Sequence, residues 1–297
     1  MSHRTSLFRQ ALGVTFRTIA ILPLSVMAVV EGREQWEARA WDPSWIPEEK
    51  LNTGDVVIFS QPWYTFLTTN PRHALSVFGV KAFQKTAWDH VGIVVVSGGV
   101  PHVVEAAPEG GARMVPYSDR VRSAKARAVA VRRLNVQRTP ESLARLGRYV
   151  DSVLRSASPT VSAYGSIFWL AYDTKEERAY FEILRDITAG ESFIKEVRSR
   201  RFYLEEDVMP AEARLARAKA CFRTISPHVE GTWSQQPSRQ EDIPPTCSEL
   251  VAACLQCLGV LPEPFPPARK YIPLDFVGQT LPFLHGTSLS DLVVVQR

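Results

Sequence analysis

The segment Thr246–Glu249 constrains the fold most, because it combines a strong helix start with a cysteine in the first turn. A threonine followed three residues later by a glutamate is the pattern of a capping box. In a capping box, the Thr246 side chain accepts a hydrogen bond from the Glu249 N–H, and the Glu249 side chain accepts one from the Thr246 N–H. The apolar residues that follow at helical spacing are Leu250, Val251, Cys254, Leu255 and Leu258. With Gly259 as a stop signal, the sequence predicts a helix that begins at Cys247.

The position of Cys247 makes it a candidate nucleophile. The unpaired N–H groups and the dipole at a helix N-terminus favour an anion, which lowers the pKa of a thiol there. The same N–H groups can stabilise an oxyanion that develops on a substrate carbonyl. The alternative interpretation is a buried cysteine that only packs, because cysteine is among the most buried residue types.

A candidate base lies upstream, where His90 begins a run of β-branched residues. Gly98-Gly99 then predicts a hairpin turn, with residues 102–106 as the return strand. A turn of two or four residues places Glu105 opposite Gly92, so that His90 and Glu105 lie on one face as diagonal neighbours, whereas a three-residue turn reverses this. We expect the cysteine-bearing helix to pack against that face. The alternative is an ordinary strand-end histidine and a solvent-facing glutamate.

Four segments in this order resemble the circularly permuted NlpC-type papain-like amidases: Gly54–Phe59, Asp89–Val94, Val103–Ala106 and Cys247–Val251. In that family the histidine precedes the cysteine, as it does here, whereas unpermuted members have the opposite order. The resemblance covers most of residues 51–275. It implies an α+β fold of the permuted papain-like type, in which an antiparallel sheet packs against the cysteine-bearing helix.

By this resemblance Cys247 is the nucleophile, His90 the base and Glu105 the third, polarising residue. By the same resemblance, Asp55 matches an acidic position near the site and Tyr164 lies in a tyrosine-containing segment of the family. Thr246, the predicted cap of the helix, is a further possible supporting residue. The implied activity is that of a cysteine-dependent hydrolase or acyltransferase that cleaves an amide or ester bond with no metal and no organic cofactor. The expected substrates are small-molecule, peptide or lipid-like. The alternative is a catalytically silent papain-like fold used as a binding or assembly module.

Two departures from the family pattern affect the substrate and the partners. Trp88-Asp89 replaces the small residue that usually precedes the histidine, so we expect a different site entrance. A charged insertion at about residues 173–242 predicts amphipathic surface helices. These helices could cover the site, bind a protein partner or only lengthen the fold, and the last is favoured. Aromatic residues between Phe59 and Trp88 predict either an apolar substrate pocket or core packing.

Composition excludes several classes of protein. The chain has 297 residues, 45% of them hydrophobic and 22% charged, which is typical of one sizeable core and of no disordered or fibrous class. Its net charge of +4 comes with no arginine-rich patch interleaved with aromatics, so no nucleic-acid partner is expected. Cys254 and Cys257 lie inside the predicted helix, and no second ligand pair completes a zinc site, so we expect buried thiols.

Residues 1–45 are predicted to be a targeting or anchoring segment, and residues 46–297 the permuted papain-like domain. Three arginines and no acidic residue precede Glu31, and the apolar positions align on one helical face, which is typical of a mitochondrial presequence. A secretory signal or membrane anchor is the alternative, because residues 18–30 are apolar. That run is short for a bilayer and contains Pro23. Under the signal or anchor alternative, residues 1–30 could associate with a membrane.

Overall fold

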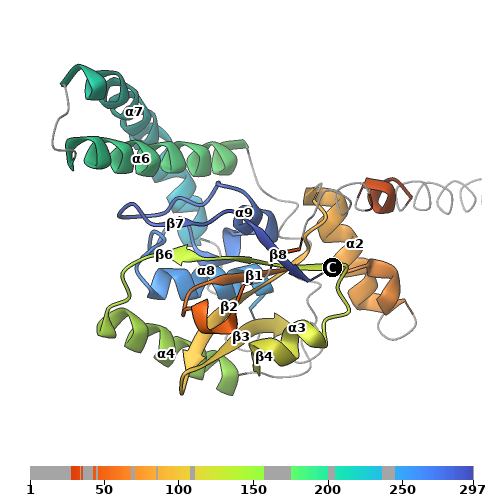
Figure 1. Cartoon of the computed structure of the whole chain (residues 1–297). Helices are drawn as coiled ribbons and strands as arrows, with labels where there is room; N and C mark the ends of the chain where they lie inside the picture. The colour runs from red at the N-terminus through yellow and green to blue at the C-terminus, as the bar shows by residue number, and fades with distance from the viewer. Residues whose placement is uncertain are drawn as a thin grey trace, which may run out of the picture.

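The structure, a computed structural model, describes residues 28–33, 35, 43–44, 46–67, 71–84, 86–107, 111–156, 175–199, 205–235 and 245–296. These residues form a mixed α+β fold around a six-stranded antiparallel sheet, with strands in the order β4-β3-β2-β1-β5-β8 (Figure 1). The predicted α+β class and the predicted antiparallel sheet are therefore confirmed. Tyr164 and residues 236–244 lie outside the described residues.

The strands of the sheet are β1 (Val56–Ser60), β2 (His90–Ser97), β3 (Val100–Ala107), β4 (Gly111–Pro116), β5 (Ala128–Arg132) and β8 (Val293–Gln296). The short strands β6 (Leu134–Asn135) and β7 (Ser288–Leu289) pair with each other. The helices not introduced below are η1 (Glu48–Lys50), η2 (Trp63–Phe66), α2 (Pro71–Gln84), η3 (Ala268–Lys270) and α9 (Pro273–Val277).

The β2–β3 hairpin has the two-residue turn that the sequence predicts. Gly98 and Gly99 both have positive φ, 59° and 80°, which a tight hairpin turn requires and which glycine adopts without strain. Ser97 therefore pairs with Val100, and the same register continues to Ile93 and Val104. One step further, it places Glu105 opposite Gly92, as expected.

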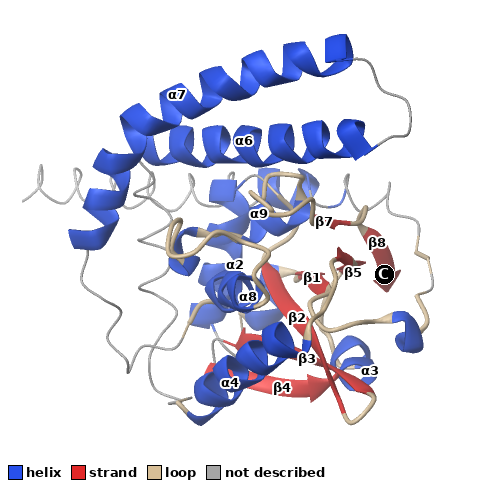
Figure 2. Cartoon of the chain, turned by 90° about the vertical axis from the view of Figure 1, so that its left-hand side faces the viewer, coloured by secondary structure: helices blue, strands red, loops and turns tan. Residues whose placement is uncertain are grey.

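The two faces of the sheet carry separate hydrophobic cores. On one face, α8 (Cys247–Cys257), α4 (Pro140–Arg155) and α9 pack on alternate strand residues such as Ile58 and Val91. On the other face, α3 (Tyr117–Arg122) packs on the intervening residues, among them Phe59. In Figure 2, α8 lies to the left of the labelled strands β2 and β3, and α3 lies to their right.

This arrangement corrects one expectation about the cysteine-bearing helix. His90 pairs with Phe59, so His90 and its diagonal neighbour Glu105 belong to the α3 face. Helix α8 instead packs on the opposite face, against β2 and β3. Tyr117 and Val121 of α3 already cover the apolar residues of the α3 face, so the apolar stripe of α8 is buried on the other face.

The insertion forms a helical hairpin of α6 (Lys175–Ser199) and α7 (Glu205–Gln235), so the prediction of helices is confirmed. At its base, the Glu177 carboxylate accepts hydrogen bonds from Trp233 Nε1 and from Lys270 Nζ, the latter at 2.7 Å. The Tyr180 ring packs edge-on against Trp233, with 4.9 Å between the ring centroids. Beyond this base the hairpin projects to one side of the sheet (Figures 1 and 2).

Part of the predicted N-terminal segment contacts the domain. Glu31 accepts a hydrogen bond of 2.5 Å from Arg127, and the Arg33 guanidinium donates to the carbonyls of Lys81 and Thr86. Val30 is buried. Residues 1–27 lie outside the described residues, so the targeting prediction remains a prediction. Among the described residues, no helix combines the length and the apolar character needed to span a membrane.

Replacing Gly92 by alanine tests the hairpin register. A Cβ there would lie 2.7 Å from Val103 Cγ1 and 3.2 Å from the Val104 carbonyl oxygen, so strand β3 would have to move. We expect Gly92→Ala to lower the free energy of unfolding by about 2 kcal/mol, measured by urea denaturation. The control is Gly147→Ala, because a Cβ at that helical position meets no atom within 4 Å. It should stabilise the protein by roughly 0.5–1 kcal/mol. Equal stability of both variants would contradict the register.

Candidate active site

The N-terminus of α8 has the capping box that the sequence predicts. Thr246 Oγ1 accepts a hydrogen bond of 3.1 Å from the Glu249 N–H, and the Thr246 N–H donates to Glu249 Oε2 at 3.3 Å. Cys247 is the first helical residue and is partly exposed. Gly259, with φ of 75°, follows the end of the helix. Cys247 therefore has unpaired N–H groups of the first turn beside its thiol.

The other three cysteines are free thiols in different surroundings. Cys254 is fully buried in the α8 core, and burial raises the pKa of its thiol well above the usual value. Burial also raises the pKa of Cys257, which is partly exposed. Cys221 is exposed on α7. Because the thiolate is the nucleophilic form, the raised pKa values make Cys254 and Cys257 poor nucleophiles near neutral pH.

His90 and Glu105 meet as the hairpin register predicts. His90 Nε2 lies 2.8 Å from Glu105 Oε2, and both residues are buried. Glu105 is fully shielded from solvent, and the His90 ring also packs against Phe59, with 5.5 Å between ring centroids. With Nε2 bound to the carboxylate, Nδ1 is the ring nitrogen left to serve another partner.

Cys247 is the other side chain that acts on the His90 ring. Burial alone would lower the pKa of His90, but the charge of Cys247 and its hydrogen bond to the ring, followed by those of Glu105, raise that pKa from 6.5 to about 10. The contact is possible although α8 packs on the other face, because His90 is the first residue of β2. The imidazole therefore sits at the end of the sheet, where the first turn of α8 also lies. The structure thus brings Cys247, His90 and Glu105 together.

Two arginines that the sequence analysis did not identify bind Glu105. Arg113 donates from Nε and Nη2 to Glu105 Oε1 at 2.8 and 2.5 Å, and Arg120 Nε donates to the same oxygen at 2.6 Å. Burial would raise the pKa of Glu105, but His90 and Arg120 hold it below its usual range, so the carboxylate is ionised. Arg113 pairs directly with Glu105 across β3 and β4. Extending the predicted hairpin by one strand could have found Arg113, whereas no local pattern indicates Arg120.

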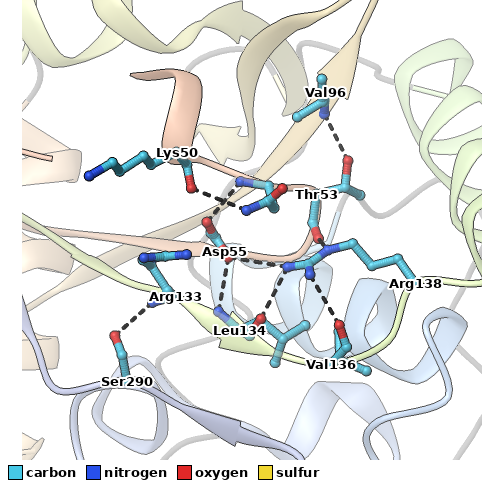
Figure 3. Close-up of polar contacts among 10 residues, drawn as sticks. Lys50, Thr53, Asp55, Val96, Arg133, Leu134, Val136, Arg138 and Ser290 are labelled. Atoms are coloured by element: carbon cyan, nitrogen blue, oxygen red, sulfur yellow. Dashed lines mark hydrogen bonds and ion pairs between the residues drawn. The ribbon is translucent and has the colours of Figure 1, made fainter. Parts of the chain in front are cut away.

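Asp55 does not join these residues. It precedes β1 at the end remote from Phe59, about 13 Å along the strand at 3.3 Å per residue. Its carboxylate accepts hydrogen bonds of 2.9 Å from the N–H groups of Asn52 and Leu134, and Arg138 Nη2 lies 3.4 Å away (Figure 3). The expectation that Asp55 lies near the site is therefore wrong. Asp55 fixes the entry into β1, because its buried carboxylate satisfies backbone donors that would otherwise be unpaired.

Asp89, which departs from the family pattern, lies inside the protein and not at the entrance. Its Oδ1 accepts a hydrogen bond of 2.7 Å from the Gln61 N–H and lies 3.3 Å from Lys81 Nζ, which donates to the Gln61 carbonyl at 2.7 Å. Burial raises the pKa of Asp89, against the effect of Lys81. The buried pair therefore fastens α2 and the loop after β1 beside His90.

The aromatic stretch after β1 forms part of the same end of the sheet. Trp63 of η2 packs edge-on against Phe78 of α2, with ring centroids 5.8 Å apart, and against Tyr64 at 6.0 Å. Tyr64 is 47% exposed. A substrate pocket here stays a prediction. Among the residues that the structure describes, no group of three or more His, Cys, Asp or Glu side chains could hold a metal ion.

No family model matches the chain, and no curated protein matches it. Five solved chains match, among them the metalloprotein yiiX from Escherichia coli O157:H7, a DUF1105 protein. That match has 14% sequence identity, covers 84% of this chain and 98% of the other, and has a TM-score of 0.36. A likeness of this extent carries no conclusion about fold or function.

The coupling between Cys247 and His90 can be measured directly. Because Cys247 supplies the largest of the effects that raise the His90 pKa, Cys247→Ala should lower that pKa from about 10. The measurement is a titration of the His90 ring protons by NMR, with Cys254→Ala as the control that leaves it unchanged. An identical His90 pKa in wild type and Cys247→Ala would show that the two side chains do not interact.

Proposed function

We propose that the protein is a thiol hydrolase or acyltransferase that cleaves an amide or ester bond. The observation that carries this proposal is the convergence of Cys247 from α8, His90 from β2 and Glu105 from β3 at one end of the sheet. A nucleophile, a base and a group that orients the base together form the arrangement that is typical of enzymes using covalent acyl transfer.

The arrangement supports the following sequence of steps. The Cys247 thiolate attacks the substrate carbonyl and forms a C–S bond, while the Cys247 N–H and a neighbouring donor of the first turn stabilise the oxyanion. The His90 imidazolium then gives its proton to the leaving group as the C–N or C–O bond breaks. Water or another acceptor, deprotonated by His90, attacks the acyl-enzyme and regenerates the thiol. Glu105 holds the imidazole in place throughout.

We further propose the permuted papain-like topology for this fold. Its support is the order of the motifs along the chain, with the hairpin that carries His90 and Glu105 before the helix that carries Cys247. The antiparallel sheet with α8 packed on one face agrees with that topology. Thr246 supports the site indirectly, because its cap fixes the first turn of α8.

Thiol labelling tests the nucleophile without knowledge of the substrate. We expect iodoacetamide near pH 7 to modify Cys247 at least about tenfold faster than Cys254 or Cys257, because burial raises the pKa values of those two thiols. Peptide mapping by mass spectrometry gives the rates. Exposed Cys221 serves as the internal reference for an unactivated, accessible thiol. Faster modification of Cys221 than of Cys247 would contradict an activated nucleophile.

Substitution of the other two residues separates their roles. His90→Ala removes the proton carrier, so turnover of a substrate found by screening should fall by about a thousandfold or more. Glu105→Gln keeps an acceptor for the imidazole N–H but loses the charge, and the loss should be roughly ten- to a hundredfold. The double variant should be no slower than His90→Ala, because the orienting group then has nothing to orient. Additive losses would show that Glu105 does not act through His90.

A non-catalytic binding or assembly module is the competing function. Its candidate interface is the projecting α6–α7 hairpin, on which Phe193 and Met209 are 46% and 61% exposed. The two functions differ in an untargeted substrate screen that compares wild type with Cys247→Ala. Identical product profiles, together with an unreactive Cys247, would favour the binding module.

A further inference from the structure

The proposed reaction leaves one buried group of the site without a role, namely Arg120 of α3. Only 8% of its side chain is exposed, and its Nε donates to Glu105 Oε1 at 2.6 Å. Its guanidinium carbon also lies 4.1 Å from the centre of the Phe59 ring. The same Phe59 ring packs against His90. Arg120 therefore contacts two of the groups that surround the imidazole.

Charge balance does not explain why a second arginine is buried here. Arg113 alone neutralises Glu105 with two hydrogen bonds, and its side chain is 49% exposed, so it remains hydrated. Adding Arg120 gives the cluster an excess positive charge once His90 is protonated. Burying a guanidinium next to another cation costs free energy, so its retention points to a geometric role.

The geometry of the carboxylate shows what that role is. Oε1 receives all three arginine hydrogen bonds, whereas Oε2 receives the one from His90 Nε2 at 2.8 Å. Arg113 of β4 is half-exposed, so the buried Arg120 of α3 is the contact that keeps the carboxylate from turning about its last bond. Oε2 is then fixed on Nε2, which leaves Nδ1 as the ring nitrogen free to interact with Cys247.

We propose that Arg120 is a positioning residue of the Cys247–His90–Glu105 site. It locks the Glu105 carboxylate and the Phe59 ring, and so keeps the imidazole directed at the thiol. This inference rests on the proposed function and deepens it, because it assigns the element α3 to the activation of the thiol.

Other charged groups around His90 could act on the same thiol. Cys247 faces the ring from α8 and Glu105 faces it from β3. Asp89 precedes His90 and is paired with Lys81 of α2. A role of Arg120 through charge alone would act on all of these groups together, so removing its charge would raise the pKa of His90. Loss of positioning would instead lower the pKa of His90, because Glu105 would no longer hold the imidazolium.

The experiment uses the full chain and compares Arg120→Gln, Arg120→Lys and the matched control Arg113→Gln. The readouts are the pH profile of Cys247 alkylation by iodoacetamide and the NMR titration of His90. We expect Arg120→Gln to shift the acid limb of the alkylation profile up by about one pH unit, about a tenfold slower rate at pH 6. The His90 pKa should fall. Arg120→Lys should show the same shift, because an ammonium cannot reproduce the planar guanidinium contacts. If Arg120→Gln does not fold, Arg120→Lys provides the test.

The control variant Arg113→Gln should change the rate of Cys247 alkylation little. Arg113→Gln removes an equal charge from the same oxygen, but its exposure screens that charge, so its rates should stay within about threefold of wild type. Wild-type behaviour of Arg120→Gln or Arg120→Lys, a rise in the His90 pKa, or a rate loss that is uniform with pH would overturn the positioning role. An unreactive Cys247 in the wild type would overturn the proposed function as well, so the two failures are distinguishable.

Discussion

The site depends on a carboxylate that is fully buried between three cationic groups. Glu105 has no exposed surface, and an ionised carboxylate without partners would not be stable there. Its partners come from three elements: His90 from β2, Arg113 from β4 and Arg120 from α3. The positions of two strands and a helix are therefore linked through one side chain. Because the Arg120 contact is the buried one, a shift of α3 alters the imidazole that this carboxylate holds.

The end of the sheet is where two opposite faces can meet in one site. Cys247 belongs to the α8 face and Glu105 to the α3 face, and the sheet separates the two cores. His90 bridges them because it is the first residue of its strand. Each core can then be packed with apolar side chains alone, and the polar groups gather where the strands stop. The Asp89–Lys81 pair and Gln61 close the same end from the side of α2.

The sequence predicted what local chemistry determines. The capping box at Thr246 and the turn at Gly98-Gly99 each require only neighbouring residues. The turn sets the strand register, and that register places His90 beside Glu105. Which face α8 covers was predicted wrongly, since it depends on how apolar stripes from distant segments fit together. Asp55 was misplaced because a matching motif carries no information on distance along a strand. Arg120 was missed because its partner lies fifteen residues away, with no periodic relation.

The order of the elements along the chain affects how the protein is made. The hairpin that carries His90 and Glu105, and the arginines that hold Glu105, are translated well over a hundred residues before Cys247. Helix α8 packs on the sheet that carries His90 and Glu105, and β8 completes that sheet, so the domain can fold as a unit only after these last segments have been made. Under the proposed function, a chain whose synthesis stops before Cys247 would carry the base and the residues that orient it but lack the nucleophile.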